Sequence, residues 1–153
     1  MEMEFRLASK SDLTPNLCQQ ILTDAQDFLK DNPIETLTAG EILAIFVNFC
    51  EGRIIDPQFW LSFKDGEFTG YMITNAATHN KQLAVYVRGA YIHPLQRGNG
   101  IAPFCLDTLE RQAKASGAKH IILQTDRKNP KAYARFMGKF GYQYMCTRFI
   151  KEI

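Results

Sequence analysis

Residues 58–94 constrain the fold more than any other stretch, because they hold three strand-like runs in succession. The first two runs, in QFWLSFKDGEFTGYMITNA, flank Asp65-Gly66, and an Asp-Gly pair between alternating apolar runs is a strong hairpin signal. The third run, QLAVYVRGAYIHP, is rich in β-branched and aromatic residues, and its Gly89 predicts a bulge or a close backbone approach. The stretch therefore predicts a hairpin followed by a long strand.

Four further segments carry apolar residues at helical spacing, over residues 17–29, 38–52, 100–116 and 130–141. The second begins at Thr38, and Glu41 three residues later completes the pattern of a capping box. The first has Ser9, Ser11 or Asp12 available as its cap. With strand patterns at EFRLAS, HIILQTD and YQYMCTRFIKEI, the order of elements predicts a mixed α/β sheet with helices packed on its faces.

Composition excludes several classes of function. A formal net charge of +2 gives no general reason to expect nucleic acid or an anionic membrane as a partner. The N-terminus lacks a secretion signal and no apolar run approaches the ~18 residues of a membrane span, so we expect a cytoplasmic protein. The four cysteines and three histidines lack metal-ligand spacing, and no metal site is predicted. Without a repeat or linker, residues 1–153 are expected to form a single domain.

The loop QRGNGIA lies between a strand that ends near His93 and a helix that begins near Gly100. Backbone N–H groups at a helix N-terminus lack intrahelical partners and lie at the positive end of the helix dipole, so they stabilise an anion. Gly98 and Gly100 allow a phosphate to approach the backbone and allow positive φ, and Arg97 adds a fixed cation. The alternative is a plain strand-to-helix turn. The pattern matches neither a P-loop nor a complete dinucleotide-binding fingerprint.

Two motifs in the second half of the chain resemble those of the GNAT superfamily of acyl-CoA-dependent N-acyltransferases. The first, the family's [RQ]-x-x-G-x-[GA] signature, is matched by Arg97-Gly98-Asn99-Gly100-Ile101-Ala102. The second, N-x-x-A followed by K-x-G-[FY], is matched by Asn129-Pro130-Lys131-Ala132 and Lys139-Phe140-Gly141-Tyr142. The resemblance implies a mixed, mostly antiparallel sheet of about six strands with about four helices on its two faces.

The resemblance also implies acetyl-CoA as the co-substrate and assigns residues to it. The diphosphate would be held by the loop residues Arg97, Gly98, Asn99, Gly100, Ile101 and Ala102. The pantetheine arm would pair with the backbone of Tyr91, Ile92 and His93. Asn129 would contact the pantetheine or orient the thioester, and it is equally suited to cap the helix that starts at Pro130.

The implied reaction is direct attack of a primary amine on the thioester in a ternary complex, with the acceptor a small molecule or a protein amine. In the family, a tyrosine seven residues after the asparagine often protonates the thiolate. Counted forward from Asn129, this position is Phe136; counted back from the second motif, it is Met137. Neither side chain carries a proton donor. Tyr133, Tyr142 and His93 stay as candidates, with core packing as the alternative for both tyrosines.

Two departures from the family pattern leave alternatives open. Without a donor tyrosine, the chain could be a catalytically degenerate acyl-CoA-binding or protein-interaction module. After Gly141 the sequence offers one strand, YQYMCTRFIKEI, where the family usually has a final hairpin. We therefore expect an acceptor side that is open or completed by a second subunit, and a homodimer is the hypothesis that follows.

Overall fold

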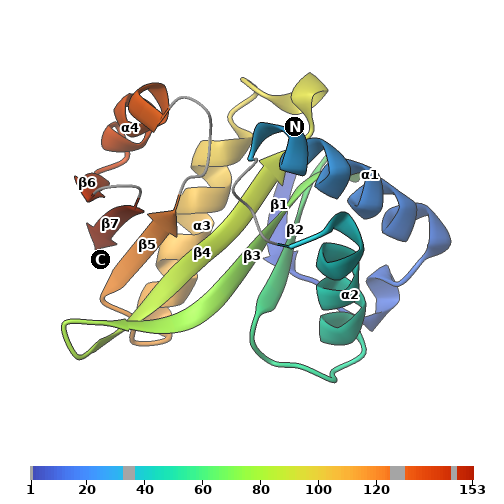
Figure 1. Cartoon of the computed structure of the whole chain (residues 1–153), viewed down its shortest axis with the longest axis horizontal. Coiled ribbons are helices and arrows are strands. Elements are labelled where there is room, and N and C mark those ends of the chain that lie inside the picture. The colour runs from blue at the N-terminus through green and yellow to red at the C-terminus, as the bar shows by residue number, and fades with distance from the viewer. Residues whose placement is uncertain (1, 33–36, 125–129, 146–147) are drawn as a thin grey trace.

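In a computed structural model that describes residues 2–32, 37–124, 130–145 and 148–153, seven strands form one sheet in the order β1-β2-β3-β4-β5-β7-β6 (Figure 1). The strands are β1 (Met3–Leu7), β2 (Gln58–Lys64), β3 (Glu67–His79), β4 (Gln82–Ile92), β5 (His120–Gln124), β6 (Gln143–Met145) and β7 (Arg148–Glu152). The α-helices are α1 (Pro15–Asp31), α2 (Ala39–Cys50), α3 (Ile101–Ala115) and α4 (Pro130–Gly138). Short 3-10 turns cover Lys10–Asp12 and Pro94–Gln96. Adjacent strands are antiparallel except β4 and β5, which are parallel.

The helices cover both faces of the sheet and enclose two cores. One core joins α1 and α2 to β2, β3 and β4, and Ile21, Phe46 and Phe59 are fully buried in it. The other lies on the opposite face under α3, where Leu109 and Ile121 are buried. This arrangement confirms the predicted mixed, mostly antiparallel sheet with helices on its two faces. None of the helices in the described ranges is long and apolar enough to cross a membrane.

The predicted hairpin forms at Asp65-Gly66, where both residues have positive φ (50° and 82°), as a two-residue turn between antiparallel strands requires. Gly89 satisfies both of its predicted roles. Thr74 of β3 lies opposite Val87 while Ile73 lies opposite Gly89, so one extra residue of β4 forms a bulge. A Cβ atom on Gly89 would also come within 3.3 Å of the Phe28 ring, so α1 packs closely against the backbone at this point.

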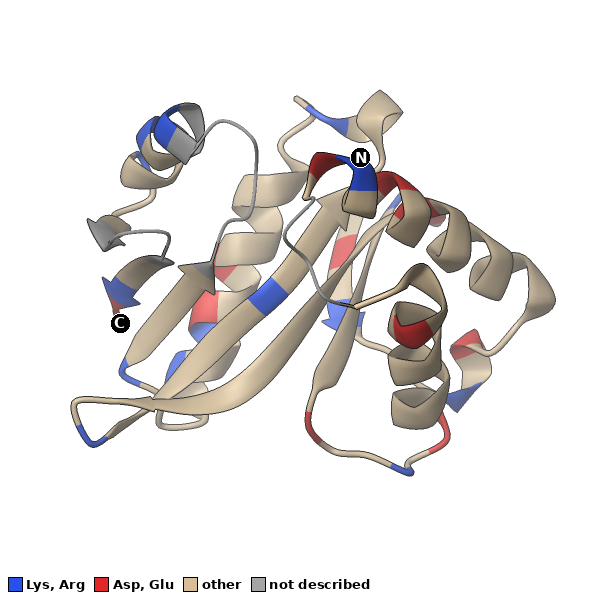
Figure 2. Cartoon of the chain, viewed as in Figure 1, with Lys and Arg blue, Asp and Glu red and all other residues tan. Residues whose placement is uncertain are grey.

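Helix α1 begins later than its predicted caps. Thr14 is the cap, its hydroxyl accepts an N–H from the first turn at 3.1 Å, and Pro15 takes the first helical position. The prediction of Ser9, Ser11 or Asp12 was wrong because these residues belong to a 3-10 turn or precede it. The acidic residues of α1 all fall in its second half, as Figure 2 shows.

The chain ends in a short hairpin, which corrects the prediction of a single final strand. β6 pairs with β7, and β7 inserts between β6 and β5, so that Leu123 lies opposite Phe149. The prediction failed because a strand of three residues, Gln143–Met145, is enough to form the outer arm. We expected an acceptor side that is open or completed by a second subunit because this hairpin was missing, and the pairing of β6 with β7 supplies it within the chain.

Asp12 ties the 3-10 turn to β1, and we expect Asp12→Asn to lower the free energy of unfolding by about 2 kcal/mol at pH 7, because it breaks a part-buried ion pair with two charge-assisted hydrogen bonds. Arg6 donates to both carboxylate oxygens at 2.8 Å, and the side chain of Asp12 is 8% exposed. These bonds hold the pKa of Asp12 below its usual value. The contribution is therefore present above the unfolded pKa near 4 and is lost as the pH falls below it.

Urea unfolding at pH 7 and pH 3 measures this difference. Asp107→Asn is the matched control, because Asp107 pairs with Arg111 at 3.3 Å while both side chains are about 70% exposed, and such pairs contribute little. A loss no larger for Asp12→Asn than for Asp107→Asn at pH 7 contradicts the assigned role.

Candidate functional site

A cleft of about 790 Å³ opens where β4 continues beyond β5. The two strands pair only from Ala84 to Val87 of β4, and β4 runs on to Ile92 without a partner on that side among the described residues. Residues of both cores line the cleft, among them Met72 and Cys105 from the α3 face and Phe28 and Tyr91 from the α1 face. The separation of β4 from β5 therefore gives access to one site from both faces of the sheet.

The predicted loop forms one end of this cleft. Gly98 and Gly100 have φ of 84° and 79°, a backbone conformation that residues with a side chain rarely adopt. A Cβ atom on Gly98 would meet nothing within 4 Å. Gly100 is the N-cap of α3, and Pro103 in the first turn has no N–H to satisfy. In the part of the chain that the structure describes, the N–H groups of residues 98–102 make no hydrogen bond. Space, free donors and the helix dipole together suit an anion.

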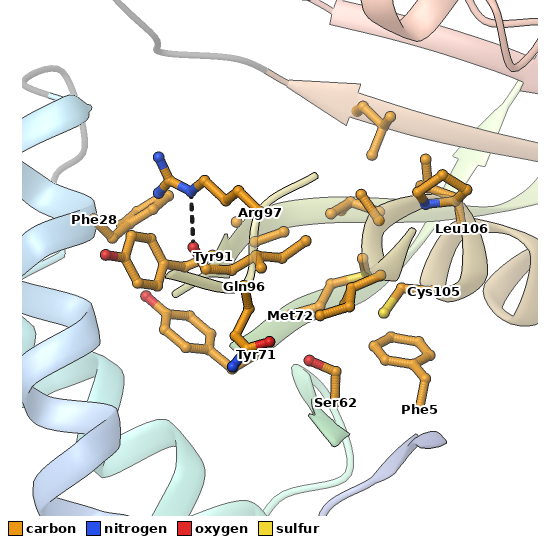
Figure 3. A pocket seen from close by; sticks show the side chains of 18 of the residues that line it. Phe5, Phe28, Ser62, Tyr71, Met72, Tyr91, Gln96, Arg97, Cys105 and Leu106 are labelled. Atoms are coloured by element: carbon orange, nitrogen blue, oxygen red, sulfur yellow. Dashed lines mark hydrogen bonds between the residues drawn. The ribbon is translucent and has the colours of Figure 1, made fainter. Parts of the chain in front are cut away.

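Arg97 lines the cleft but turns back along β4 (Figure 3). Its Nε donates to the carbonyl oxygen of Ile92 at 2.9 Å, and its guanidinium carbon lies 5.2 Å from the centre of the Tyr91 ring. A ligand that pairs with the Ile92 carbonyl therefore shares this oxygen with Arg97 or displaces it. The backbone N–H of His93 was predicted to pair with pantetheine. It donates instead to the carbonyl oxygen of Thr69 at 2.8 Å and is therefore already part of the sheet.

Two of the predicted catalytic candidates, Tyr142 and His93, do not line the cleft. Tyr142 is buried in the α3-side core, with the Lys151 ammonium 5.7 Å from its ring centre, and is not among the cleft residues. His93 is not among them either, and its Nδ1 accepts from Leu95 at 3.4 Å. Tyr133 belongs to α4. Asn129 lies outside the described residues.

Phe136 and Met137 both line the cleft. They are the two residues that could occupy the position of the family's tyrosine. Met137 is 1% exposed and belongs to the α3-side core, whereas Phe136 is 39% exposed. Neither side chain carries a proton to give, as the sequence indicates. The α4 wall therefore contributes apolar surface at these two positions.

Two buried polar groups lie on the α1 side of the sheet, and one of them, Asp24, was missed by the sequence analysis. Asp24 is 4% exposed and its Oδ2 has no hydrogen-bond partner within the described structure. Burial, reinforced by the Asp27 carboxylate and opposed by His93, raises the pKa of Asp24 to about 6. Tyr91 is equally buried, and its hydroxyl has no partner in the same residues. Burial first, then the carboxylates of Asp27 and Asp24, raises the pKa of Tyr91.

One pattern in the sequence could have identified Asp24 as a buried acidic residue. Residues 24, 28 and 31 follow the spacing of a single helix face, and aspartate stands at the first and last of these positions on a face that is otherwise apolar. Asp31 lines the cleft and Phe28 does so beside it. An acidic residue on the buried face of an amphipathic helix is rare unless it has a partner or a function.

The structure is an open mixed sheet whose parallel strands β4 and β5 separate next to the glycine loop and the N-terminus of α3. The chain belongs to the Acetyltransferase (GNAT) family, whose profile matches residues 22–142. No curated protein matches the chain.

Solved structures show the same fold. The PaiA N-acetyltransferase from Thermoplasma acidophilum, in complex with coenzyme A, is 18% identical with a TM-score of 0.70 and full coverage of both chains. A predicted acetyltransferase with acetyl-CoA from Clostridium acetobutylicum is 21% identical with a TM-score of 0.65, over 95% of this chain and 92% of the other. A GNAT family acetyltransferase from Brucella melitensis, in complex with acetyl-CoA, is 15% identical with a TM-score of 0.63, over 99% and 88%.

Proposed function

We propose that the protein is a cytoplasmic N-acetyltransferase, with residues 1–153 as its single catalytic domain, that transfers the acetyl group of acetyl-CoA to a primary amine. The observation that carries the proposal is the loop at the N-terminus of α3. Its free N–H groups open into a cleft that passes between β4 and β5. Similar structures with coenzyme A or acetyl-CoA bound support the choice of co-substrate.

In this proposal, the backbone of Gly98, Asn99, Gly100, Ile101 and Ala102 holds the diphosphate. Arg97 leaves the Ile92 carbonyl to join them, and the pantetheine arm then pairs with the exposed side of Tyr91 and Ile92. Asn129 orients the thioester. The thioester lies in the gap between β4 and β5, in a cleft whose lining is mostly apolar.

The acceptor amine reaches the thioester from the α1 face, because the α3 face is taken by the co-substrate. The neutral amine attacks the carbonyl carbon in a ternary complex, the C–S bond breaks and the thiolate takes up a proton. Positioning both reactants in one cleft supplies much of the rate enhancement. Small molecules and protein amines both fit the proposal.

A degenerate acyl-CoA-binding module is the second candidate, and Phe136 and Met137 favour it because the α4 wall offers no donor at these positions. Release of free thiol from acetyl-CoA over a panel of small amines and lysine peptides separates the two candidates. We expect release that depends on the amine, together with acetyl-CoA binding by calorimetry. Binding without release for any amine supports the module, and absence of binding overturns both.

We also propose a homodimer as the solution state, because strands β1 and β6 leave two exposed sheet edges. Light scattering after size exclusion at micromolar concentration measures the mass directly. A clean monomer of 17.5 kDa removes the dimer and leaves the catalytic proposal intact.

A further inference from the structure

Three aromatic rings line the α1 side of the cleft and contact one another. Phe28 of α1 and Tyr71 of β3 pack edge to face with ring centres 6.4 Å apart, and the ring centres of Tyr71 and Tyr91 are 6.3 Å apart. All three residues are buried in the fold and line the cleft. Because the face of an aromatic ring carries partial negative charge, it attracts a cation. Phe28, Tyr71 and Tyr91 therefore form an aromatic wall that suits a positively charged group.

The protein places a cation of its own on this aromatic wall. The guanidinium carbon of Arg97 lies 5.2 Å from the centre of the Tyr91 ring, which is the distance of a cation–π contact. The Arg97 Nε donates to the carbonyl oxygen of Ile92 at 2.9 Å, as Figure 3 shows. Within the described residues Arg97 forms no salt bridge, so the ring face and the carbonyl hold it. The space over Tyr91 therefore fits a guanidinium group.

The C-terminal end of α1 adds negative potential to the same cleft. Asp31, the last residue of α1, and its C-cap Asn32 both line the cleft. Carbonyl groups at a helix C-terminus lack intrahelical partners and lie at the negative end of the helix dipole, so they favour a cation. Lys30 of the same turn pairs with Asp27 at 3.4 Å and does not line the cleft. The cleft is thus lined by two helix ends of opposite polarity, the C-terminus of α1 and the N-terminus of α3.

Among the described residues that line the cleft, the charged ones are Asp31, Arg88 and Arg97. Arg88 is the extra residue of the β4 bulge, three residues and about 10 Å of strand away from Tyr91. Arg97 belongs to the α3 loop, and the proposed function moves it to the diphosphate of acetyl-CoA. Once Arg97 has moved, the aromatic wall has lost the cation that covers it in the free protein.

We propose that the aromatic wall and Asp31 form a cation subsite of the acceptor pocket, so that the acceptor is an amine with a second, unreactive positive charge, a guanidinium or an ammonium group. The inference rests on the proposed N-acetyltransferase function and names the class of its acceptor. The reacting amine does not occupy this subsite, because a carboxylate and ring faces stabilise the ammonium form and disfavour the neutral nucleophile. The second cation instead holds the acceptor while its amine reaches the thioester.

The direct test is the binding of propylguanidinium, which carries the cation without a reactive amine, measured by calorimetry at low salt. We expect the wild type loaded with coenzyme A to bind this probe about 5-fold more tightly than the free protein, because Arg97 no longer covers the Tyr91 ring. Arg97→Ala without coenzyme A is expected to show a similar gain over the free wild type, because the substitution uncovers the same ring.

Two pairs of variants, each loaded with coenzyme A, identify the groups that hold the probe. Tyr91→Leu removes the ring and is expected to weaken probe binding about 5-fold, whereas Tyr91→Phe keeps the ring and should stay within about twofold of the wild type. Asp31→Asn is expected to weaken binding about 3-fold, because a carboxylate near a bound cation is lost. Asp107→Asn is its control, since Asp107 is exposed and does not line the cleft. Asp31 is also exposed, so this pair tests the subsite even where Tyr91→Leu does not fold.

Acceptor selectivity extends the test to catalysis. Thiol release from acetyl-CoA is compared for alkylamines that end in a guanidinium and for alkylamines of the same chain length that end in a methyl group. We expect kcat/KM to be about 10-fold higher for the guanidinium series, mainly through a lower KM, because the ring faces and the carboxylate both hold the cation. Asp31→Asn should reduce this ratio and leave the methyl series unchanged.

The outcomes separate the cation subsite from the transferase. If coenzyme A does not tighten probe binding, or if Asp31→Asn and Asp107→Asn bind the probe equally, the cation subsite is overturned. If both amine series are acetylated equally well, the acceptor class is overturned while the transferase stands. If no amine is acetylated although the probe binds as expected, the transferase fails and the cation subsite stands.

Discussion

Gly100→Glu is expected to weaken the binding of acetyl-CoA by at least about 100-fold, which corresponds to about 2.7 kcal/mol. Gly100 is the N-cap of α3 and lies where the free N–H groups of the loop converge on the cleft. A glutamate there places a carboxylate beside the proposed diphosphate, and like charges in a partly water-excluded site repel strongly. Isothermal calorimetry with the wild type and the variant measures the change.

Gly100 has a φ of 79°, so any side chain at this position strains the backbone and lowers stability. The control variant must therefore carry the same strain. Gly52→Glu meets this need, since Gly52 has a φ of 72°, lies in open space and follows α2, away from the loop. Both variants are expected to lose similar stability in thermal melts, and only Gly100→Glu should lose binding. If the two variants bind acetyl-CoA equally well, the α3 loop does not hold the diphosphate.

The features that sequence reasoning predicted are those that local chemistry decides. The turn at Asp65-Gly66 and the loop at Gly98 and Gly100 need positive φ, and the residues that tolerate it are visible in the sequence. The capping box of Thr38 and Glu41 is likewise a contact between residues three apart. Such features follow from spacing alone, and the structure reproduces each of them.

The features that sequence reasoning missed depend on contacts between distant residues. Asp12 resembles a helix cap in the sequence, but Arg6 from β1 binds its carboxylate and makes it part of an ion pair. The final hairpin depends on β7 pairing with β5, which stabilises a β6 too short to be recognised by pattern. Asp24 stands at an apolar position of α1 by helical spacing, but only the packing of α1 on the sheet shows that its carboxylate is buried.

The same packing explains why the site lies where it does. The bulge of β4 opposite Ile73 and Thr74 comes just where the pairing with β5 ends, and bulges bend and twist the strand that carries them. Gly89 then lets the Phe28 ring close over the β4 backbone. The departure of β4 from β5 and the contact of α1 with β4 therefore coincide, and Phe28 of α1 lines the same cleft as the α3 loop.

Asp24→Asn is expected to gain about 3 kcal/mol of stability relative to the wild type between pH 4 and pH 7. The pKa of Asp24 is about 6 in the fold against 3.8 in its ordinary state. Between these values the folded protein holds a proton that the unfolded chain has lost, so the wild type becomes less stable as the pH rises through this range. The variant cannot titrate at this position, and every other group contributes equally to both proteins.

Urea unfolding at pH 4, 5, 6 and 7 gives the two stability curves, and their difference is the quantity to follow. The buried amide that Asp24→Asn introduces destabilises the variant by a similar amount at every pH. The way in which the difference in unfolding free energy varies with pH is therefore more informative than its size at any one pH. Asp107→Asn should run parallel to the wild type, since the Asp107–Arg111 pair is exposed and lies on another helix. Parallel curves for Asp24→Asn and the wild type would mean that Asp24 ionises as freely in the fold as in the unfolded chain.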